Sequence, residues 1–299
     1  TYICCVTHAL TSKPTKAMKK ILVPCDFSKA SIQAFKFALD LAKKSKGSVT
    51  LLHVIELPYL YDTTLMPAFN FEEKMLSDLK VHNEKKLNQL IQKQAQDDLP
   101  VNATVSYGPL ADVIVDRIQQ LGIDLVVMGS KGATGIREFV SGSNAEKVVR
   151  HAPVPVITVK TKSPLTTTNI VVPNTLDTDA QEELMMKVKA LQKFFDAHLH
   201  IVWINTPLNF SPDNITHERL QKFAKRFMLK DFSLHIFNHH SEEAGIIAFS
   251  KSVNAGMIAM GTNGRTGIAH ILKGSVAEDV TNHTDLLVWT YSWKKNDAA

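Results

Sequence analysis

Two glycine-rich segments with the same spacing are the part of this sequence best suited to chemistry. They occupy residues 129–143 and 261–275, and both follow the pattern G-x-x-G, nine further residues and then Gly-Ser. Each comes directly after a short run of branched apolar residues, which is typical of a buried parallel strand. Such a loop after a strand predicts a phosphate site, because its backbone N–H groups can approach an anion. Tight turns without a ligand are the plainer alternative.

The spacing of these loops is not that of a P-loop. The chain contains no G-x-x-x-x-G-K-[ST], so the lysine and the magnesium-binding hydroxyl of that motif are missing. Neither a carboxylate pair nor a nucleophile with its base lies close by in the sequence. Lys131 and Arg137 follow the first glycine, where they either pair with phosphate or stay solvated. We therefore expect phosphate to be held there, with slow hydrolysis or autophosphorylation left open.

Length and composition indicate two ordinary globular domains. The chain has 299 residues, 44% of them apolar and 21% charged, and a domain commonly has ~100–200 residues. The net charge of +5 is spread among scattered side chains, which argues against a nucleic-acid surface. No apolar run approaches the ~20 residues that span a bilayer. Cys4, Cys5 and Cys25 form no disulfide framework, which fits a cytoplasmic protein.

The hydrophobic pattern predicts the strands and helices that position the two glycine loops. Strands and helices alternate, which predicts a parallel sheet with helices on both faces. Ser28 is a good helix N-cap, and Gly47 is expected to close the first helix. The expected strands are 21–24, 48–55, 101–107, 124–127 and 153–159, and the expected helices are 30–44, 71–96, 110–121 and 143–151.

The second half repeats this order of elements. Strands are expected at 169–173, 200–204, 232–238, 257–260 and 286–291, and helices at 181–197, 215–227 and 244–253. The interval from Pro24 to Pro173 exceeds the interval from Gly129 to Gly261, so the second copy is shorter around its second helix. This pattern indicates a tandem duplication, not a solenoid of short repeats.

The domain boundaries follow from composition. Met18-Lys19-Lys20 resembles a natural start, so residues 1–17 are expected to be an upstream extension or a vector remnant without signal-peptide features. The first domain is then 18–160. A segment rich in Thr, Ser, Lys and Pro at 161–168 is the expected linker, and the second domain is 169–299.

With its start at 21–28, Leu52-His53-Val54 and the doubled glycine pattern, the chain resembles the universal stress protein family. The resemblance covers two complete domains and is closest to the family's ATP-binding branch. It implies two open, parallel five-stranded α/β sheets with helices on both faces, of the adenine-nucleotide alpha-hydrolase type. Family domains commonly pair through their last strand. Residues 153–159 and 285–291 are therefore expected to pair within the chain as an intramolecular pseudo-dimer.

The resemblance also implies a ligand and its residues. The ligand is ATP, or else ADP or AMP, with Mg²⁺ on the phosphates. The acidic residue after the first strand and nearby backbone would hold the nucleoside, while the glycine loop and Gly-Ser would hold the phosphates. In the first copy the matching residues are Pro24, Cys25, Asp26, Val54, Met128, Gly129, Gly132, Gly142, Ser143 and Asn144. In the second copy they are Gly261, Gly264, Gly274, Ser275 and Val276.

The second copy departs from the pattern on its nucleoside side. Thr175 stands where Asp26 stands in the first copy, and Asp177, opposite Ser28, is expected to be a helix cap. The turn Gly108-Pro109 has no counterpart at 238–240. We therefore expect the first site to bind ATP better than the second, which is weak or silent.

Plainer roles exist for several of these residues. Asp26 and Ser143 could serve as helix caps, and Cys25 as a small buried apolar side chain. The clustered histidines at 198–200 and 235–240 have no Cys or acidic residue at a recognisable zinc spacing, so no metal site is expected. The absence of G-x-G-x-x-G after the first strand counts against a nicotinamide or flavin oxidoreductase.

Three hypotheses for function remain. The leading one is a cytosolic stress-response protein that binds ATP and acts as a nucleotide-dependent regulator. The second is a slow ATPase or an autophosphorylating enzyme. The third is a scaffold in which the loops are relics and the surface binds a protein partner. A homodimer of the two-domain chain also stays open.

Overall fold

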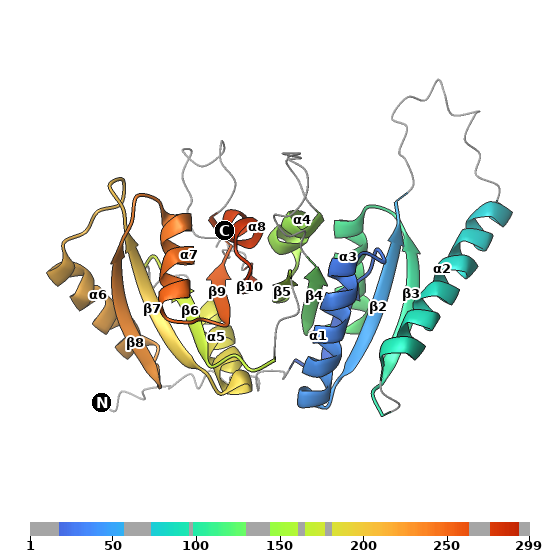
Figure 1. The fold of residues 1–299 in the computed structure, drawn as a ribbon, viewed down its shortest axis with the longest axis horizontal. Coiled ribbons are helices and arrows are strands. Elements are labelled where there is room, and N and C mark those ends of the chain that lie inside the picture. Colours follow the sequence, from blue (N-terminus) through green and yellow to red (C-terminus); the bar gives the residue numbers. More distant parts are fainter. Residues whose placement is uncertain are drawn as a thin grey trace, which may run out of the picture.

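Strands and helices alternate along the chain (Figure 1). The computed structural model describes residues 18–56, 73–95, 98–129, 144–160, 165–176, 181–262 and 276–292. The first half contains β1 (Lys20–Pro24), α1 (Lys29–Ser45), β2 (Ser48–Ile55), α2 (Glu73–Gln94), β3 (Val101–Tyr107), α3 (Leu110–Leu121), β4 (Leu125–Gly129), α4 (Asn144–His151) and β5 (Val156–Val159). The second half contains β6 (Asn169–Pro173), α5 (Glu182–Phe195), β7 (His198–Asn205), α6 (Asp213–Arg226), β8 (Phe232–Asn238), α7 (Glu242–Ser252), β9 (Met257–Gly261), α8 (Val276–His283) and β10 (Leu287–Tyr291).

All the strands belong to one sheet in the order β3-β2-β1-β4-β5-β10-β9-β6-β7-β8. Within each half the strands are parallel, as crossover helices require. The halves join where β5 and β10 pair antiparallel. The predicted pair of five-stranded parallel sheets, united through their last strands, is thus confirmed.

The junction between the halves has the symmetry of a two-fold axis. Ile157 of β5 faces Trp289 of β10 at its centre, and on either side Thr158 faces Val288 while Thr290 faces Val156. The hydroxyl groups of Thr158 and Thr290 each donate to the carbonyl of the valine opposite, both at 3.4 Å. The two domains therefore contact each other as the protomers of a homodimer would, although they are parts of one chain.

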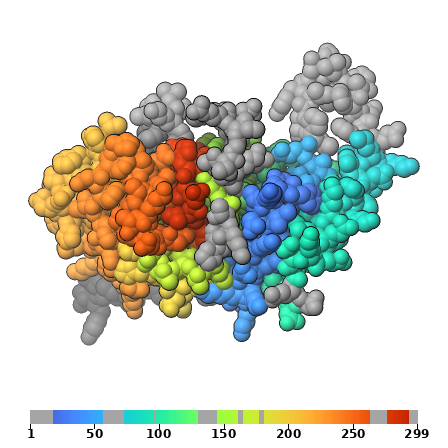
Figure 2. Space-filling view, in the orientation of Figure 1, coloured from blue at the N-terminus to red at the C-terminus, as the bar shows by residue number. Residues whose placement is uncertain are grey.

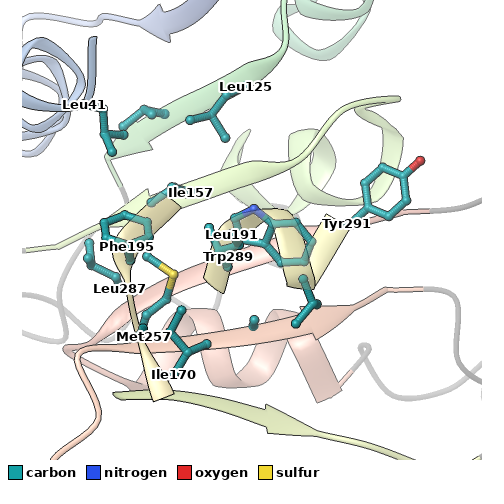
Figure 3. Close-up of a cluster of buried hydrophobic side chains, with 14 of the residues drawn as sticks. Leu41, Leu125, Ile157, Ile170, Leu191, Phe195, Met257, Leu287, Trp289 and Tyr291 are labelled. Carbon is teal, nitrogen blue, oxygen red and sulfur yellow. The ribbon is translucent and has the colours of Figure 1, made fainter. Parts of the chain in front are cut away.

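Apolar side chains cover both faces of the sheet. On the face of α1, α2, α5 and α6, one cluster of buried residues continues through both domains. Trp289 lies in this cluster at the junction, near Ile157 and Leu191 (Figure 3). On the opposite face, α3 and α4 cover one cluster in the first domain, and α7 and α8 cover another in the second. The two halves consequently form a continuous body in the space-filling view (Figure 2).

Of the predicted helix caps that the structure describes, Ser28 is right and Gly47 is wrong. Ser28 caps α1 as expected, because its hydroxyl accepts a hydrogen bond from the Ser31 N–H at 3.2 Å. The left-handed residue that ends α1 is Lys46, with φ of 52°, and not Gly47. A Cβ on Gly47 would lie 2.1 Å from the Lys19 carbonyl oxygen, so the glycine serves close packing there. The N-cap position of α5 is Gln181, and the predicted cap Asp177 lies outside the described residues.

Candidate functional site

The candidate site lies where the strand order of the first domain reverses. From β1 the chain proceeds to β2 on one side, whereas β4 lies on the other side. Only Ile21 with Leu125 and Leu22 with Val126 are paired between β1 and β4, so pairing stops before either strand ends. Open α/β sheets bind ligands in the crevice at the carboxyl ends of such strands. Pro24 and Gly129, the last residues of β1 and β4, flank this crevice.

Asp26 presents an exposed carboxylate directly after β1. Its Oδ1 accepts a hydrogen bond from the Ser28 N–H at 3.0 Å, just before the first turn of α1. Burial alone would raise the pKa of this carboxyl group, but hydrogen bonds from Ser28 and Ser31 outweigh burial and bring the pKa below its usual value. Asp26 is therefore ionised at neutral pH. It caps the loop and is also open to a ligand, so the two roles predicted for it are compatible.

The loop that carries Asp26 is held from the side by β2 and α2. Phe27 has a left-handed φ of 63°, and its ring lies 4.9 Å from the His53 ring. His53 Nδ1 lies 2.8 Å from the Cys25 carbonyl oxygen. Lys86 of α2 places its Nζ 5.6 Å from the centroid of the Phe27 ring. These contacts fix the backbone on both sides of Asp26.

Cys25 has the plain structural role predicted as its alternative. Its side chain is buried, and its Sγ lies 3.7 Å from the Ser31 hydroxyl. Burial raises the pKa of the thiol, which keeps it protonated. The Cys25 side chain is therefore part of the core, and its backbone lies between β1 and Asp26.

Val54 and Met128 supply an apolar wall on the α3 side of the crevice. Met128 is buried, whereas Val54 is half-buried and packs against the same cluster. Gly108 lies at the border of this side, where its N–H donates a hydrogen bond to the Ile55 carbonyl at 3.2 Å. Its φ is +125°, a value that only glycine adopts readily. An apolar wall beside an exposed carboxylate suits a nucleoside, whose base is apolar on its faces and whose ribose donates hydrogen bonds.

Gly129 is a glycine because α1 packs against it. A Cβ at this position would lie 2.5 Å from the Ala30 carbonyl carbon and 2.7 Å from the Ser31 nitrogen. The end of β4 therefore touches the first turn of α1, next to the Ser28 cap. This close approach brings a helix N-terminus, which favours anions, to the switch point.

Part of the predicted phosphate side lies outside the described residues. Asn144 is the first residue of α4, and Val276 is the half-buried first residue of α8. Gly261 ends β9, which matches the position of Gly129 at the end of β4. The remaining predicted residues fall outside the described ranges: Gly132, Gly142, Ser143, Gly264, Gly274 and Ser275.

The second domain keeps the backbone frame of this site. Leu176 has a φ of 58°, close to the value at Phe27, and the Asn174 N–H donates to the Val202 carbonyl at 3.0 Å. In the first domain Cys25 makes the same contact with Leu52 at 2.7 Å. The pairing of β6 with β9 is also limited to two residue pairs.

Its side chains, however, are different. Thr175 replaces the carboxylate, and its hydroxyl lies 3.4 Å from Gln181 Nε2. Arg219 of α6 donates to the Thr175 carbonyl at 3.3 Å and stacks over Trp203, where Lys86 contacts Phe27 in the first domain. At the position of Asp26 the second domain thus carries a neutral hydroxyl group in place of a carboxylate.

The space beside β7 and β8 is also more filled. Ile204, at the position of Val54, is only 6% exposed. His239 takes the place of Gly108: its N–H donates to the Asn205 carbonyl at 2.9 Å, and its ring stacks on Phe237. A larger side chain at both positions leaves less room for a base than in the first domain.

Sequence reasoning missed the residues that hold the Asp26 loop. In the sequence His53 stands out only as part of a family pattern, and Lys86 and Arg219 are not distinguished from other basic residues on their helices. The signal is weak in the sequence, because contacts between a strand, a loop and a helix follow from the tertiary fold. Aligning the two halves of the sequence gives one indication of these contacts. Lys86 and Arg219 then occupy matching positions, each directly before a leucine that is buried in the structure.

In the part of the chain that the structure describes, no group of three or more His, Cys, Asp or Glu side chains is placed to hold a metal ion. In the same ranges, no helix combines the length and the apolar character needed to cross a membrane.

Comparison with known proteins identifies the family. The model of the Universal stress protein family matches the chain twice, at residues 18–160 and 166–291. Universal stress protein MJ0531 of Methanocaldococcus jannaschii is 30% identical over 143 residues, which are 48% of this chain and 82% of that protein. Universal stress protein YxiE of Bacillus subtilis is 27% identical over 146 residues, which are 47% of this chain and 98% of that protein.

A solved structure shares the two-domain architecture. The universal stress protein from Archaeoglobus fulgidus superimposes with a TM-score of 0.69, covering 94% of this chain and 98% of its own, at 19% identity. At this identity the likeness concerns the fold alone. The two matches to the family model show that the chain belongs to the universal stress protein family and carries two of its domains in tandem.

Proposed function

We propose that the first domain binds ATP at the switch point between β1 and β4, and that the chain is a cytosolic, nucleotide-dependent regulator. The observation that carries this proposal is the exposed, ionised carboxylate of Asp26, which lies beside the apolar wall of Val54 and Met128. The family supports it, because the glycine pattern after β4 resembles that of the ATP-binding branch.

Each residue has a distinct role in this proposal. Asp26 accepts hydrogen bonds from the ribose hydroxyl groups, and Val54 and Met128 contact the base. Gly129 and the glycine loop after it bind the phosphates through backbone N–H groups. ATP itself supplies the triphosphate, whose charge Mg²⁺ reduces. The missing P-loop lysine and hydroxyl favour binding without efficient hydrolysis.

The second domain is proposed to be weak or silent toward ATP. Thr175 cannot replace the charge of Asp26, and Ile204 and His239 reduce the space for the base. One nucleotide per chain is therefore the expected stoichiometry.

Two measurements on the full chain test the proposal. Protein purified without added nucleotide is denatured, and the supernatant is analysed by mass spectrometry for bound ATP, ADP or AMP. ATP is then titrated by calorimetry. One site per chain is expected, and Asp26→Asn should weaken binding by about tenfold or more, which is the loss of about 1.4 kcal/mol. Asp40→Asn, an exposed aspartate within α1, is the matched control and should leave affinity unchanged.

The same preparation separates the alternatives. No released nucleotide together with no heat of binding would remove the proposal, and a stable partner recovered by pull-down would then favour a scaffold. Phosphate release above background that disappears in both Asp26→Ala and Gly132→Val would favour a slow ATPase. Release that neither substitution changes would indicate a contaminant.

A further inference from the structure

Two histidines on the outer strands of the second domain face each other. His200 of β7 and His235 of β8 are half-buried, and His200 Nδ1 lies 3.1 Å from His235 Nε2. Phe249 of α7 packs against both rings, at 6.4 Å and 4.9 Å between centroids. The pair is therefore on the α7 face of the sheet, close to its edge, because β8 is the last strand.

A third side chain orients His200. The Oδ1 of Asn169 lies 3.3 Å from His200 Nε2. Because an amide oxygen only accepts hydrogen bonds, Nε2 carries the ring proton and Nδ1 presents its lone pair to His235. Histidines that bind metals are usually held in this way, with the remote N–H donating to an oxygen.

Both rings are neutral near neutral pH, which is the form that binds metals. Burial lowers the pKa of His200 to about 4, aided by the nearby His198 and His235. Burial and His198 also lower the pKa of His235.

His198 belongs to the surroundings of the pair and not to the pair itself. Its Nδ1 lies 2.6 Å from Asp231 Oδ1, and its Nε2 lies 2.8 Å from the Ser233 hydroxyl, so neither nitrogen is available. No third His, Cys, Asp or Glu among the described residues is placed to complete a set. Water is therefore the ligand that we assign to the remaining positions of a metal held there.

We propose that His200 and His235 together bind one late first-row divalent cation, Zn²⁺ or Cu²⁺, with water as the other ligands. Imidazole nitrogen suits both ions. With metal–nitrogen bonds of ~2.0–2.1 Å, the 3.1 Å separation corresponds to an angle of roughly 100° at the metal, between square-planar and tetrahedral values. His235 changes tautomer on binding: its proton moves from Nε2 to Nδ1 by exchange with solvent, so no net proton is released.

The site is particular to the second domain. By strand register, Thr50 and Thr104 occupy the positions of His200 and His235 in the first domain. The metal site is also distinct from the proposed ATP site, which lies in the other domain. The outcome of the metal-binding test is therefore independent of whether the chain binds nucleotide.

The test uses the full chain in which Cys4 and Cys5 are replaced by serine, because adjacent thiols would compete for the same ions. After chelator treatment, Zn²⁺ is titrated by calorimetry and Cu²⁺ binding is followed by electron paramagnetic resonance. One ion per chain is expected, with two imidazole nitrogens coupled to Cu²⁺. His200→Gln and His235→Gln should each weaken binding at least tenfold, and Asn169→Ala by about tenfold through loss of ring orientation.

His217→Gln, at an exposed position of α6, is the control and should change nothing. Saturable binding of unchanged affinity in both pair variants would overturn the proposal, as would no Zn²⁺ binding below millimolar concentration. If either variant unfolds, imidazole nitrogen NMR of the chain with both histidines decides instead. Zn²⁺ must then shift the signals of His200 and His235, and unshifted signals would reject the site.

Discussion

Arg150 and Glu278 form a bidentate ion pair across the junction of the two domains. Arg150 Nε and Nη2 donate to Glu278 Oε1 at 3.0 Å and 2.7 Å, and Nη2 also donates to Oε2 at 2.9 Å. The arginine lies in α4 and the glutamate in α8, and only 7% of the glutamate side chain is exposed. The pair thus links the short helices that follow the two glycine loops (Figure 1).

The pseudo-two-fold axis relates this ion pair to a second contact between α4 and α8, in which one side chain is of a different type. The offset from Gly129 to Gly261 also relates Glu146 to Glu278 and Arg150 to Asn282. Asn282 donates to Glu146 at 2.7 Å, so the equivalent contact exists with an amide in place of the guanidinium. Duplication of a self-paired domain explains both contacts, and divergence left one ion pair where a homodimer would have two equal contacts.

The first prediction concerns this ion pair. Arg150→Met leaves the Glu278 carboxylate buried without its cation, and we expect a loss of about 2–4 kcal/mol of unfolding free energy, since Arg150 itself is partly exposed. The double variant Arg150→Met/Glu278→Met should recover much of that loss, because both charges are gone. Urea unfolding measures both. Lys222→Met, in the exposed pair with Glu218, is the control and should cost under about 0.5 kcal/mol.

Much of the fold follows from hydrophobic periodicity. The strands 101–107 and 232–238 were predicted to the residue, because each is bounded by a turn and has a clear β pattern. The pairing of the last strands was expected from the family resemblance and not from the residues, and its antiparallel direction comes from the structure. The Arg150 ion pair had no local signal, because its partners are 128 residues apart and meet only after the sheet forms.

The second prediction concerns Gly129. Gly129→Ala places a Cβ 2.5 Å from the Ala30 carbonyl carbon, so α1 must shift away from β4. We expect a loss of about 1–3 kcal/mol in unfolding free energy, as for overpacked cores, together with weaker ATP binding. Thermal unfolding and calorimetry measure the two effects. Lys36→Ala, at an exposed position of α1, should leave both values unchanged, and a fully stable Gly129→Ala would contradict the close approach.

The third prediction concerns pH. Burial raises the pKa of Asp26, but hydrogen bonds from Ser28 and Ser31 more than offset it, so the folded-state pKa lies below the unfolded one. The ionised form therefore stabilises the fold above the ordinary carboxyl range, and this contribution is lost as pH falls through the folded pKa. The difference in Tm between the natural chain and Asp26→Asn should be constant from about pH 8 to pH 5 and shrink below about pH 4. A difference that shrinks already near pH 6 would show that the carboxyl pKa is raised instead.

The sequence suffices to propose the outline of the candidate site, but not the contacts that support it. Duplicated glycine spacing indicates a phosphate site, and Asp26 follows from its place after a strand. The contact of His53 with the Cys25 carbonyl and that of Lys86 with Phe27 depend on how β2 and α2 lie beside β1. Such contacts join segments that sequence patterns treat separately.

The fourth prediction concerns why the second domain differs. If the missing carboxylate were the only reason why the second domain does not bind ATP, Thr175→Asp would create a second ATP site. We expect it not to, because Ile204 and His239 still occupy the space that Val54 and Gly108 leave open in the first domain. Adding His239→Gly and Ile204→Val to Thr175→Asp should raise the calorimetric stoichiometry from one toward two. The same set in an Asp26→Asn background assigns the new heat to the second domain, and a full second site in Thr175→Asp alone would show that charge, not space, is decisive.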